Sequence, residues 1–341
     1  MKARTVAKRN GRRPRLAFVG LGWIGVHRLN TIASSDAVEI AALYDEQRNA
    51  SEAARQIAPQ ATIISSYDEI LEDSIDGVVI ATPNAFHVTQ TVAALRAGIS
   101  VFCQKPLGCN VPEVWQAVSA ARESNCLLGV DFSYRFIPGM QQIRELVQAG
   151  ELGKIFSVDL KFHNGYGPDK KWFYERAASG GGCVLDLGIH LIDLGLWTLN
   201  FPRIADVTSA LFHQGNRIKP PCEEVEDYAV ARMRTVDDVV LNLTCSWNLH
   251  VGADAEIEVC FYGTEGAAVL RNVNGSFHDF AAERYQSSRR ERIYETGSDS
   301  NWGGLAALDW CQRLAQGERF GAHTEEFLSS AAVIDRIYAR N

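Results

Sequence analysis

The chain has 341 residues, 46% of them hydrophobic and 22% charged, with 28 glycines and 10 prolines. This composition is ordinary for a globular protein and excludes a disordered chain, a collagen-like repeat and a coiled coil. At roughly 100–200 residues per domain, the length favours two domains, each with a sizeable core.

The charge is distributed unevenly along the sequence. Seven of the 34 basic residues stand in the first fifteen positions with no acidic residue among them, so the rest of the chain has 27 basic residues against 41 acidic ones. A body this acidic repels phosphate groups, and we therefore expect no nucleic-acid partner. We interpret residues 1–14 as a basic, flexible tail.

The eight cysteines lie singly, mostly in apolar segments, and none forms the C-x-x-C pair typical of zinc sites. We expect reduced core thiols, no metal site and a cytoplasmic location. No uninterrupted apolar stretch approaches the roughly 18 residues of a membrane span. The longest runs from Leu16 to Val26 and contains three glycines, so the sequence predicts no membrane association.

Short β-rich runs alternate with helical patterns from residue 15 to residue 129. The expected strands are Leu16–Gly20, Glu39–Asp45, Ala61–Ser65, Gly77–Ala81, Ser100–Cys103 and Leu127–Val130. The expected helices are His27–Ser34, Glu46–Ala58, Tyr67–Glu72, Ala85–Ala97 and Val111–Ser124. Almost wholly apolar strands separated by helices indicate a parallel sheet covered on both faces. We therefore predict a doubly wound α/β domain over residues 15–133.

The pattern changes after Pro138. A helix, Met140–Ala149, and a strand, Lys154–His163, precede a glycine-rich stretch and a helix, Asp186–Leu199. Alternating runs then predict a mostly antiparallel sheet, with strands at Asp206–Phe212, Asp227–Arg234, Val239–Trp247, Glu256–Tyr262 and Ala267–Arg271. Two helices follow, Trp302–Gln316 and Thr324–Ala339, the second with a capping signal at Thr324. We predict an α+β domain with a large sheet over residues 134–341.

The sequence Gly20-Leu21-Gly22-Trp23-Ile24-Gly25 fits the pattern G-x-G-x-x-G between a strand and a helix. The first glycine permits a tight turn, the second lets the backbone approach a pyrophosphate, and the third allows close packing of helix and strand. Asp45 ends the second strand, where a carboxylate accepts a hydrogen bond from a ribose 2′-hydroxyl. Because Asp45 would repel a 2′-phosphate, we expect NAD rather than NADP, although Arg48 stands nearby.

Two further segments close predicted parallel strands. Ala81-Thr82-Pro83-Asn84-Ala85-Phe86-His87 follows the fourth strand and Gln104-Lys105-Pro106 follows the fifth. Ligands of open parallel sheets bind outside the carboxyl ends of the strands, so both segments should face the cofactor. Farther on, Asp186 and His190 stand four residues apart on one helix face after a glycine run. A histidine beside a carboxylate suits the removal of a hydroxyl proton.

Together these motifs resemble the glucose–fructose oxidoreductase/inositol dehydrogenase family (Gfo/Idh/MocA), from about Arg15 to about Tyr338. The resemblance extends to Gly150-Glu151-Leu152-Gly153-Lys154-Ile155 and to the turn Tyr262-Gly263-Thr264-Glu265-Gly266. It implies an oxidoreductase that transfers a hydride between a nicotinamide cofactor and a hydroxyl-bearing carbon of a sugar, an inositol-like polyol or a related carbohydrate. The implied fold is a Rossmann domain followed by an α+β domain.

The resemblance also implies roles for particular residues. Lys105 would hold the reacting hydroxyl against the nicotinamide, His190 would be the acid/base residue, and Asp186 would bind substrate or orient the histidine. The remaining cofactor-binding candidates are Gly20, Gly22, Trp23, Ile24, Gly25, Asp45, Ala81, Thr82, Asn84, His87 and Gln104. The sequence departs from the family's common E-K-P because Gln104 replaces the glutamate, which removes a negative charge beside Lys105.

The substrate pocket is less defined by the sequence. Aromatic and basic residues before and around the glycine run are candidates, because aromatic rings stack on sugars and basic groups bind hydroxyls; we select His163, Tyr166, Trp172 and Arg176. Two alternatives stay open: a nucleotide-binding redox sensor without turnover, and an enzyme that oxidises one sugar and reduces another with tightly bound cofactor. We also expect a homodimer or homotetramer formed through the second domain's sheet, because its strands carry apolar residues on both faces.

Overall fold

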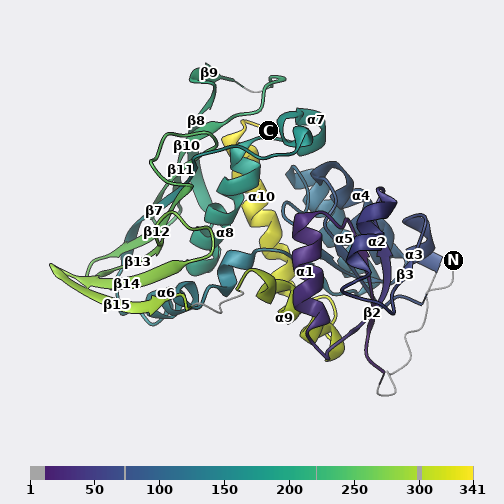
Figure 1. The fold of residues 1–341 in the computed structure, drawn as a ribbon. Coiled ribbons are helices and arrows are strands. Elements are labelled where there is room, and N and C mark those ends of the chain that lie inside the picture. The colour runs from purple at the N-terminus through teal and green to yellow at the C-terminus, as the bar shows by residue number, and fades with distance from the viewer. Residues whose placement is uncertain (1–11, 73, 220, 298–301, 341) are drawn as a thin grey trace. The chain divides into compact units, whose positions relative to one another are not determined.

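A computed structural model describes residues 12–72, 74–219, 221–297 and 302–340. Most of the predicted basic tail therefore lies outside the described residues. The chain forms two compact units (Figure 1). Unit 1 contains the residues up to Gly108, Pro112–Asp131 and Gly304–Phe327, and unit 2 contains Cys109–Val111, Phe132–Gly303 and the residues from Leu328 onward.

Unit 1 is built on a parallel sheet of six strands in the order β3-β2-β1-β4-β5-β6. The strands are β1 (Arg15–Val19), β2 (Glu39–Tyr44), β3 (Thr62–Ile63), β4 (Gly77–Ile80), β5 (Ser100–Cys103) and β6 (Leu128–Val130). The helices between them are α1 (Trp23–Ala33), α2 (Arg48–Ala54), α3 (Asp68–Glu72), α4 (Asn84–Arg96) and α5 (Val111–Ser124). β4, β5 and β6 are buried along their whole length, as the uninterrupted apolar runs predicted. The predicted doubly wound domain is confirmed.

One helix of unit 1 comes from far along the chain. α9 (Leu305–Ala315) begins after a 3-10 turn, η4 (Trp302–Gly304), and carries Trp310, which is 1% exposed. The Trp310 ring lies so close to β4 and β6 that a Cβ added at Gly77 or Gly129 would stand 2.7 Å from it. The predicted assignment of residues 134–341 to one domain is therefore wrong for residues 304–327, because their apolar side chains complete the core of unit 1.

Unit 2 contains a nine-stranded sheet in the order β15-β14-β13-β12-β7-β11-β10-β8-β9. The strands are β7 (Ile155–Asn164), β8 (Ile204–His213), β9 (Asn216–Ile218), β10 (Tyr228–Thr235), β11 (Val240–Ser246), β12 (Ala255–Gly263), β13 (Ala267–Asn272), β14 (Phe280–Gln286) and β15 (Arg289–Glu295). Among the described strands of this sheet, only the pairing of β7 with β11 is parallel, so the mostly antiparallel sheet is confirmed. β9 and the hairpin of β14 and β15 were not predicted individually.

The remaining helical elements are η1 (Ser133–Phe136), α6 (Pro138–Gln148), η2 (Lys171–Tyr174), α7 (Arg176–Ser179), a π-helical turn η3 (Val184–Gly188), α8 (Ile189–Thr198), η5 (Ala322–Glu325) and α10 (Glu326–Ile337). Of these, η5 and the first two residues of α10 belong to unit 1, and the others belong to unit 2. The capping signal at Thr324 was wrong, because α10 starts only at Glu326, after a 3-10 turn that contains the buried Thr324.

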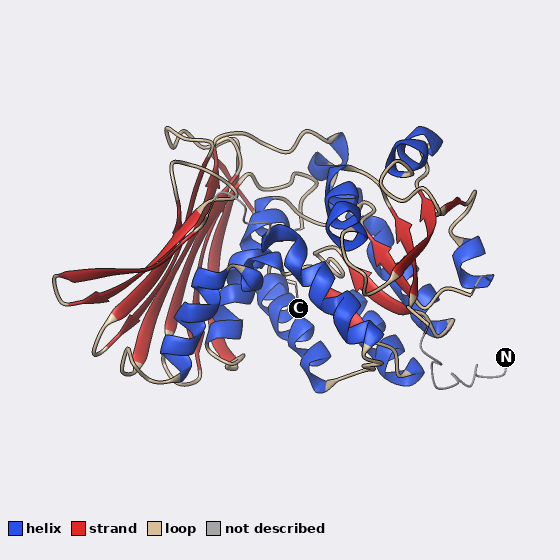
Figure 2. Cartoon of the chain, turned by 60° about the horizontal axis from the view of Figure 1, so that its bottom comes forward, coloured by secondary structure: helices blue, strands red, loops and turns tan. Residues whose placement is uncertain are grey.

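The two faces of the sheet differ in chemistry. Along β10, Ala229, Ala231 and Met233 are buried, while Val230 and Arg232 between them are exposed. The buried face packs on η3 and α8, since added Cβ atoms at Gly188 of η3 and Gly195 of α8 would contact side chains of β7 and β11. Figure 2 shows helices on one side of this sheet, and within unit 2 α6 contacts β13, β14 and β15 while α8 contacts β7 and β11. We call the helix-covered side the inner face and the other side the outer face.

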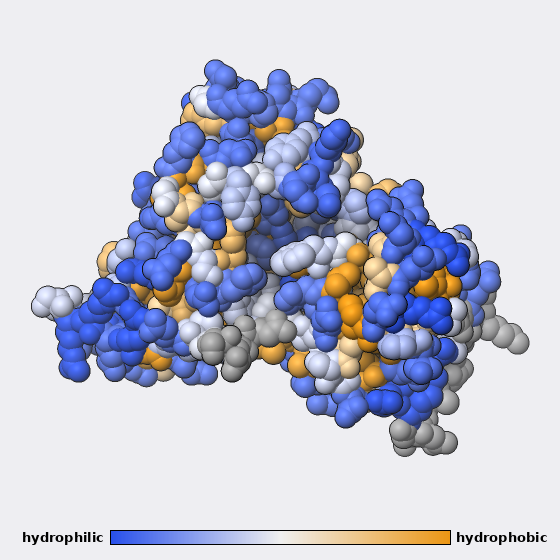
Figure 3. Space-filling view, viewed as in Figure 1, coloured by the Kyte–Doolittle hydropathy of each residue, from blue (hydrophilic) through white to orange (hydrophobic). Residues whose placement is uncertain are grey.

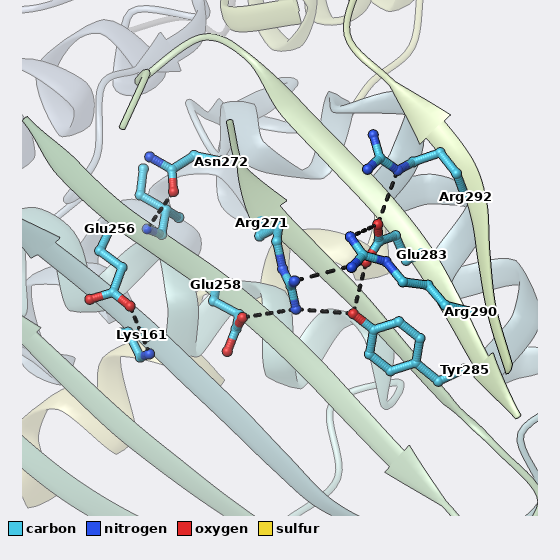
Figure 4. A network of polar contacts seen from close by, with 10 residues as sticks. Lys161, Glu256, Glu258, Arg271, Asn272, Glu283, Tyr285, Arg290 and Arg292 are labelled. Carbon is cyan, nitrogen blue, oxygen red and sulfur yellow. Dashed lines mark hydrogen bonds and ion pairs between the residues drawn. The ribbon is translucent and has the colours of Figure 1, made fainter. Parts of the chain in front are cut away.

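Charged side chains pair across the outer face (Figure 4). Lys161 of β7 lies 3.0 Å from Glu256 of β12, and Arg271 lies 3.2 Å from Glu258. The projecting end of β14 and β15 is correspondingly hydrophilic in Figure 3. The apolar residues that we expected on the second face of β11 and β12 are present in part, since Val240, Cys260 and Tyr262 share that face with Asn242, Thr244, Glu256 and Glu258. The dimer or tetramer stays a prediction, which light scattering can test.

A helical run in unit 2 is longer than the helix Asp186–Leu199 that the sequence predicted. Among the described residues, Arg176–Thr198 is the one segment long and apolar enough to cross a membrane by length and composition, and 78% of its most apolar window is buried inside the protein. Core helices of soluble proteins pass the same test.

The cysteines agree with the expectation of buried core thiols: all eight thiols are free, and seven are buried, with Cys222 half-buried.

Candidate active site

The three glycines after β1 have three different environments. Gly20 has φ +84°, and a Cβ there would lie 2.5 Å from the carbonyl carbon of Ala81 at the end of β4. A Cβ at Gly25 would lie 2.0 Å from the carbonyl oxygen of Gly20. At exposed Gly22, the residue before α1, an added Cβ would meet nothing within 4 Å. The backbone is thus close-packed at the ends of the loop and open in its middle, at a helix N-terminus where a pyrophosphate fits.

Asp45 directly follows β2, beside this loop. Its carboxylate accepts hydrogen bonds from the backbone N–H of Leu21 at 2.7 Å and of Gln47 at 2.8 Å. The carboxylate therefore fixes the glycine loop, and its contact with a ribose hydroxyl stays a prediction. Trp23, which is 71% exposed at the start of α1, and the half-buried Ile24 border the same loop.

The segment after β4 does not contribute all the side chains that we predicted. His87 is fully buried, with Nδ1 2.6 Å from the carbonyl oxygen of Pro106 and Nε2 2.7 Å from that of Thr82. Burial lowers the pKa of His87. The prediction that His87 lines the cofactor pocket is therefore wrong, because both ring nitrogens hold together the segments after β4 and β5. Ala81 and Thr82 are half-buried, and the Thr82 hydroxyl donates to Gln90 at 2.7 Å. Asn84 begins α4 and is 8% exposed.

Lys105 stands half-buried after β5, where its backbone is held by its neighbour. The Gln104 amide oxygen accepts from the Lys105 backbone N–H at 3.0 Å, and its amide nitrogen donates to Asp131 at 3.0 Å. Asp131 is fully buried and pairs with the guanidinium of Arg28 on α1 at 2.5 Å. An amide suits this position because it both accepts and donates, whereas a glutamate carboxylate would face the Asp131 carboxylate. This explains why this chain has Gln104 beside Lys105.

Asp186 and His190 occupy successive turns in unit 2. Asp186 lies in the π-helical turn η3, and the Trp247 indole N–H donates to its carboxylate at 3.0 Å. His190 lies in the first turn of α8, is 8% exposed, and its ring centroid stands 4.8 Å from that of Tyr134. Burial raises the pKa of the Tyr134 phenol, so this neighbour stays neutral. Sequence reasoning expected a regular α-helix from Asp186, and the π turn was not foreseen.

Glu226 is a functional candidate that sequence reasoning missed. Its carboxyl oxygen accepts from the backbone N–H groups of Gly182 at 2.9 Å and Val184 at 3.0 Å, and from the Tyr338 hydroxyl at 2.6 Å. Burial raises its pKa. A Cβ at Gly182 would lie 1.9 Å from the Glu226 carbonyl oxygen, which explains a glycine there. Glu226 therefore fixes the start of the helical run that carries Asp186 and His190.

Besides Lys105, Asp186 and His190, four residues were predicted to bind substrate, and all four lie in unit 2. His163 is wrong as a candidate: it alternates with the inner-face Phe162, bonds to Ser246 at 2.8 Å and stacks on Tyr228, so it lies on the outer face, opposite α8. The others lie in the connection between β7 and η3. Tyr166 is 52% exposed, and the ring of Trp172 stacks on that of Phe173 with their centroids 3.8 Å apart. The Arg176 guanidinium donates a hydrogen bond to the Glu224 carbonyl oxygen at 3.2 Å. Lys105 belongs to unit 1, whereas Asp186 and His190 belong to unit 2.

A parallel sheet with an open glycine-rich loop, a strand-end aspartate and a second unit carrying an Asp–His pair defines a dinucleotide-dependent oxidoreductase class. The family model described as "Oxidoreductase family, NAD-binding Rossmann fold" matches residues 14–132, and the model described as "GFO/IDH/MocA C-terminal domain" matches residues 140–269. The chain belongs to the Gfo/Idh/MocA family of oxidoreductases, as the sequence motifs predicted, and its first domain is the NAD-binding domain of that family.

Individual proteins resemble this chain over most of its length. D-glucoside 3-dehydrogenase of Escherichia coli (strain K12) is 28% identical over 269 residues, which are 75% of this chain and 76% of that protein. 1,5-anhydro-D-fructose reductase of Ensifer adhaerens is 32% identical over 213 residues, 62% of this chain and 61% of that protein. The solved structure of levoglucosan dehydrogenase with NADH and levoglucosan has a TM-score of 0.82 at 20% identity, covering 96% of this chain and 97% of that one. GenD2 from gentamicin A biosynthesis, solved with NAD, has a TM-score of 0.80 at 22% identity, covering 98% and 97%.

Proposed function

We propose that the protein is an NAD-dependent dehydrogenase or reductase that acts on a hydroxyl-bearing carbon of a sugar, a polyol or a sugar derivative. The observation that supports this most is the pair of Asp186 and His190 on successive turns of a run whose start Glu226 holds. The named relatives from E. coli and E. adhaerens carry sugar derivatives in their names, which supports a carbohydrate substrate. The open loop at Gly22 suits the pyrophosphate of either cofactor, and the carboxylate of Asp45 favours NAD over NADP because it would repel a 2′-phosphate.

The chain's own groups supply the proton chemistry of this reaction. When bound, the nicotinamide exchanges a hydride with the carbon that bears the reacting hydroxyl. His190 takes the hydroxyl proton during oxidation and returns it during reduction. The Lys105 ammonium donates a hydrogen bond to the same oxygen and stabilises its developing negative charge. Asp186, whose carboxylate is fixed by Trp247, binds a substrate hydroxyl.

A substrate panel tests this proposal against the sensor and the sugar–sugar oxidoreductase. Protein stripped of cofactor is assayed with NAD and NADP against inositols, aldoses and oxidised sugars, and NADH formation is recorded. We expect turnover with NAD on at least one class of sugar. Cofactor binding without turnover on any member would favour the sensor, and cofactor that stays bound through purification would favour the coupled reaction.

The roles of His190 and Lys105 are separable by their pH profiles. His190→Asn should lower oxidation by about 10²–10⁴-fold and abolish the rise of kcat/KM with pH, with NAD affinity retained. Lys105→Met should also lower turnover but keep that rise, because it removes charge stabilisation and positioning. An unchanged profile in His190→Asn would move the base to another group, with Lys105 the first to examine.

A further inference from the structure

The glycine run before Asp186 packs against two segments of unit 2 that are far away in the sequence. A Cβ at Gly180 would lie 2.4 Å from the Cys109 Sγ, and a Cβ at Gly181 would lie 2.2 Å from the Tyr338 hydroxyl oxygen. Gly180 also has φ +79°, in the left-handed region that glycine adopts without strain. The glycine run is therefore a contact surface for these two segments, and side chains larger than hydrogen would push them away.

Arg340 joins the first of these segments to the glycine run. It follows α10 in the chain, which ends beside α7 (Figure 1), and its guanidinium donates to the Gly180 carbonyl oxygen at 2.7 Å. The other terminal nitrogen donates to the Cys109 carbonyl oxygen. A guanidinium presents its donors in a rigid plane, so it can hold two carbonyl groups in a fixed geometry, whereas a lysine presents all its donors from a single nitrogen.

The Arg340 side chain is itself held in place by α10. The Arg340 backbone N–H donates to the Asp335 carbonyl oxygen at 2.8 Å, and its guanidinium lies 3.4 Å from the Asp335 carboxylate. The guanidinium carbon also stands 4.4 Å from the ring centroid of Tyr338. The second oxygen of the Asp335 carboxylate accepts from the Val111 backbone N–H at 2.8 Å. Arg340 is thus preorganised for the two carbonyl groups, and Asp335 ties the same segment to α10 a second time.

The two chain segments that Arg340 holds lead directly to residues proposed for catalysis. Residues 106–108 connect Lys105 to Cys109, and all of them are buried. Residues 181–185 connect Gly180 to Asp186, and all of them are buried as well. A close-packed chain transmits a displacement to its neighbours instead of absorbing it. A shift at Cys109 or Gly180 would therefore move the side chains that follow or precede them.

We propose that Arg340 is a positioning residue for the reaction. It holds the segment after Lys105 against the glycine run and thereby sets the geometry in which Lys105 and His190 act on one hydroxyl group. The inference rests on the proposed function for the roles of Lys105 and His190 only. Positioning of this kind matters because a misplacement of about 1 Å can cost about 100-fold in rate.

Arg336 offers a matched control on the same helix. Its guanidinium also donates to two backbone carbonyl oxygens, those of Ile204 and Ala205, at 2.8 Å each. These two residues begin β8. Arg336→Ala therefore loses the same kind and number of hydrogen bonds as Arg340→Ala, but at another place in unit 2. A difference between the two variants reports on where the bonds are, since the loss of stability should be similar.

Amide hydrogen exchange measured by mass spectrometry tests the connection independently of turnover. In full-length Arg340→Ala, the amides of residues 109–111 and 181–186 should exchange about tenfold faster than in Arg336→Ala, because the bonds that hold these segments are lost. Arg340→Lys keeps the charge but not the planar group, and it should give an intermediate rate. Equal exchange of these amides in the two alanine variants overturns the inference.

Steady-state kinetics on a sugar found by the substrate panel tests the positioning role. Arg340→Ala should lower kcat about tenfold per folded molecule, with NAD affinity and the rise of kcat/KM with pH retained because His190 is unchanged. Arg336→Ala should keep the kcat of the unchanged protein. Because the Arg340 side chain is 27% exposed, millimolar guanidinium should restore part of the lost kcat to Arg340→Ala.

The two experiments separate failure of this inference from failure of the proposed function. Faster exchange in Arg340→Ala with an unchanged kcat would make Arg340 a structural residue only and would overturn the inference. If the unchanged protein turns over no sugar, the dehydrogenase function fails, and the difference in exchange alone decides whether Arg340 holds the two segments together.

Discussion

Two helices in this protein begin after glycine-rich segments, and the two helix starts differ in whether the protein itself supplies the hydrogen-bond acceptor. In unit 1 the middle of the loop is open at Gly22, and the helix start faces free space. In unit 2 the corresponding position is filled by the protein's own Glu226, which accepts from the backbone of Gly182 and Val184. A helix N-terminus attracts an acceptor or an anion in both cases. One start is left for a ligand, and the other is used internally to fix the residues proposed for proton transfer.

Removing the internal partner should have the largest effect. Glu226→Ala leaves two buried N–H groups and the buried Tyr338 hydroxyl without their acceptor, and we expect about 4 kcal/mol lower free energy of unfolding. Urea unfolding measures it. A loss below about 1 kcal/mol would mean that Glu226 does not hold the helical run. NAD affinity, measured on the folded fraction, should change little because the glycine loop is untouched.

The two ends of the open loop should respond differently to added methyl groups. Gly25→Ala places a Cβ 2.0 Å from the Gly20 carbonyl oxygen and should cost about 3 kcal/mol of stability. Gly22→Ala meets nothing in the protein, so its stability should be nearly unchanged while NAD binds about tenfold more weakly. Thermal unfolding and NAD titration separate the two effects. Full NAD affinity in Gly22→Ala would place the pyrophosphate elsewhere.

A substitution at Asp45 tests whether the protein prefers NAD or NADP. Asp45→Ser removes a carboxylate from the ribose position, so the kcat/KM ratio of NAD to NADP should fall by the equivalent of about 2 kcal/mol. Because Asp45 also holds the Leu21 N–H, absolute affinity for both cofactors should decrease. A ratio that does not move would show that Asp45 serves the loop alone.

Two buried carboxyl groups of unit 2 should give opposite pH dependences of stability. Burial raises the pKa of Glu226 above its ordinary 4.5, so the folded state retains a proton that the unfolded state releases, and stability falls as pH rises above 4.5 towards the folded-state pKa. Burial alone would also raise the pKa of Glu283, which is 1% exposed, but hydrogen bonds from Arg290, Tyr285 and Arg292 lower it instead. The stabilisation that Glu283 contributes to the folded state is therefore fully present above pH 4.5, and it is lost as the pH falls through the lowered pKa.

Urea unfolding across pH measures these slopes, each at most about 1.4 kcal/mol per pH unit. Glu226→Gln should remove the loss of stability above pH 4.5, and Glu283→Gln should remove the loss at acidic pH. A Glu226→Gln curve parallel to that of the unchanged protein would mean that this carboxyl group titrates normally.

The parts of this protein that could be predicted from sequence are those determined by neighbouring residues. The positions of the glycine loop, of Asp45 and of the parallel strands were predicted correctly because each depends on a short local pattern. A glycine in G-x-G-x-x-G, or an uninterrupted apolar run between two helices, is compatible with one kind of local structure. His163 was misplaced because its face depends on its register with β11, which lies some 80 residues away in sequence. Glu226 was missed because an acidic run, Glu223-Glu224-Val225-Glu226-Asp227, reads as a solvated loop, although one member is fully buried.

The return of residues 304–327 to unit 1 has a consequence for protein engineering. Trp310 packs against positions 77 and 129 only after the whole sheet of unit 2 has been synthesised, so the nucleotide-binding unit cannot complete its core while it is the only part made. A chimera that exchanges cofactor domains between relatives at a single junction near residue 132 would take the parallel sheet of unit 1 from one parent and α9 from the other. Exchanges that also carry residues 304–327 should give the better-folded hybrids.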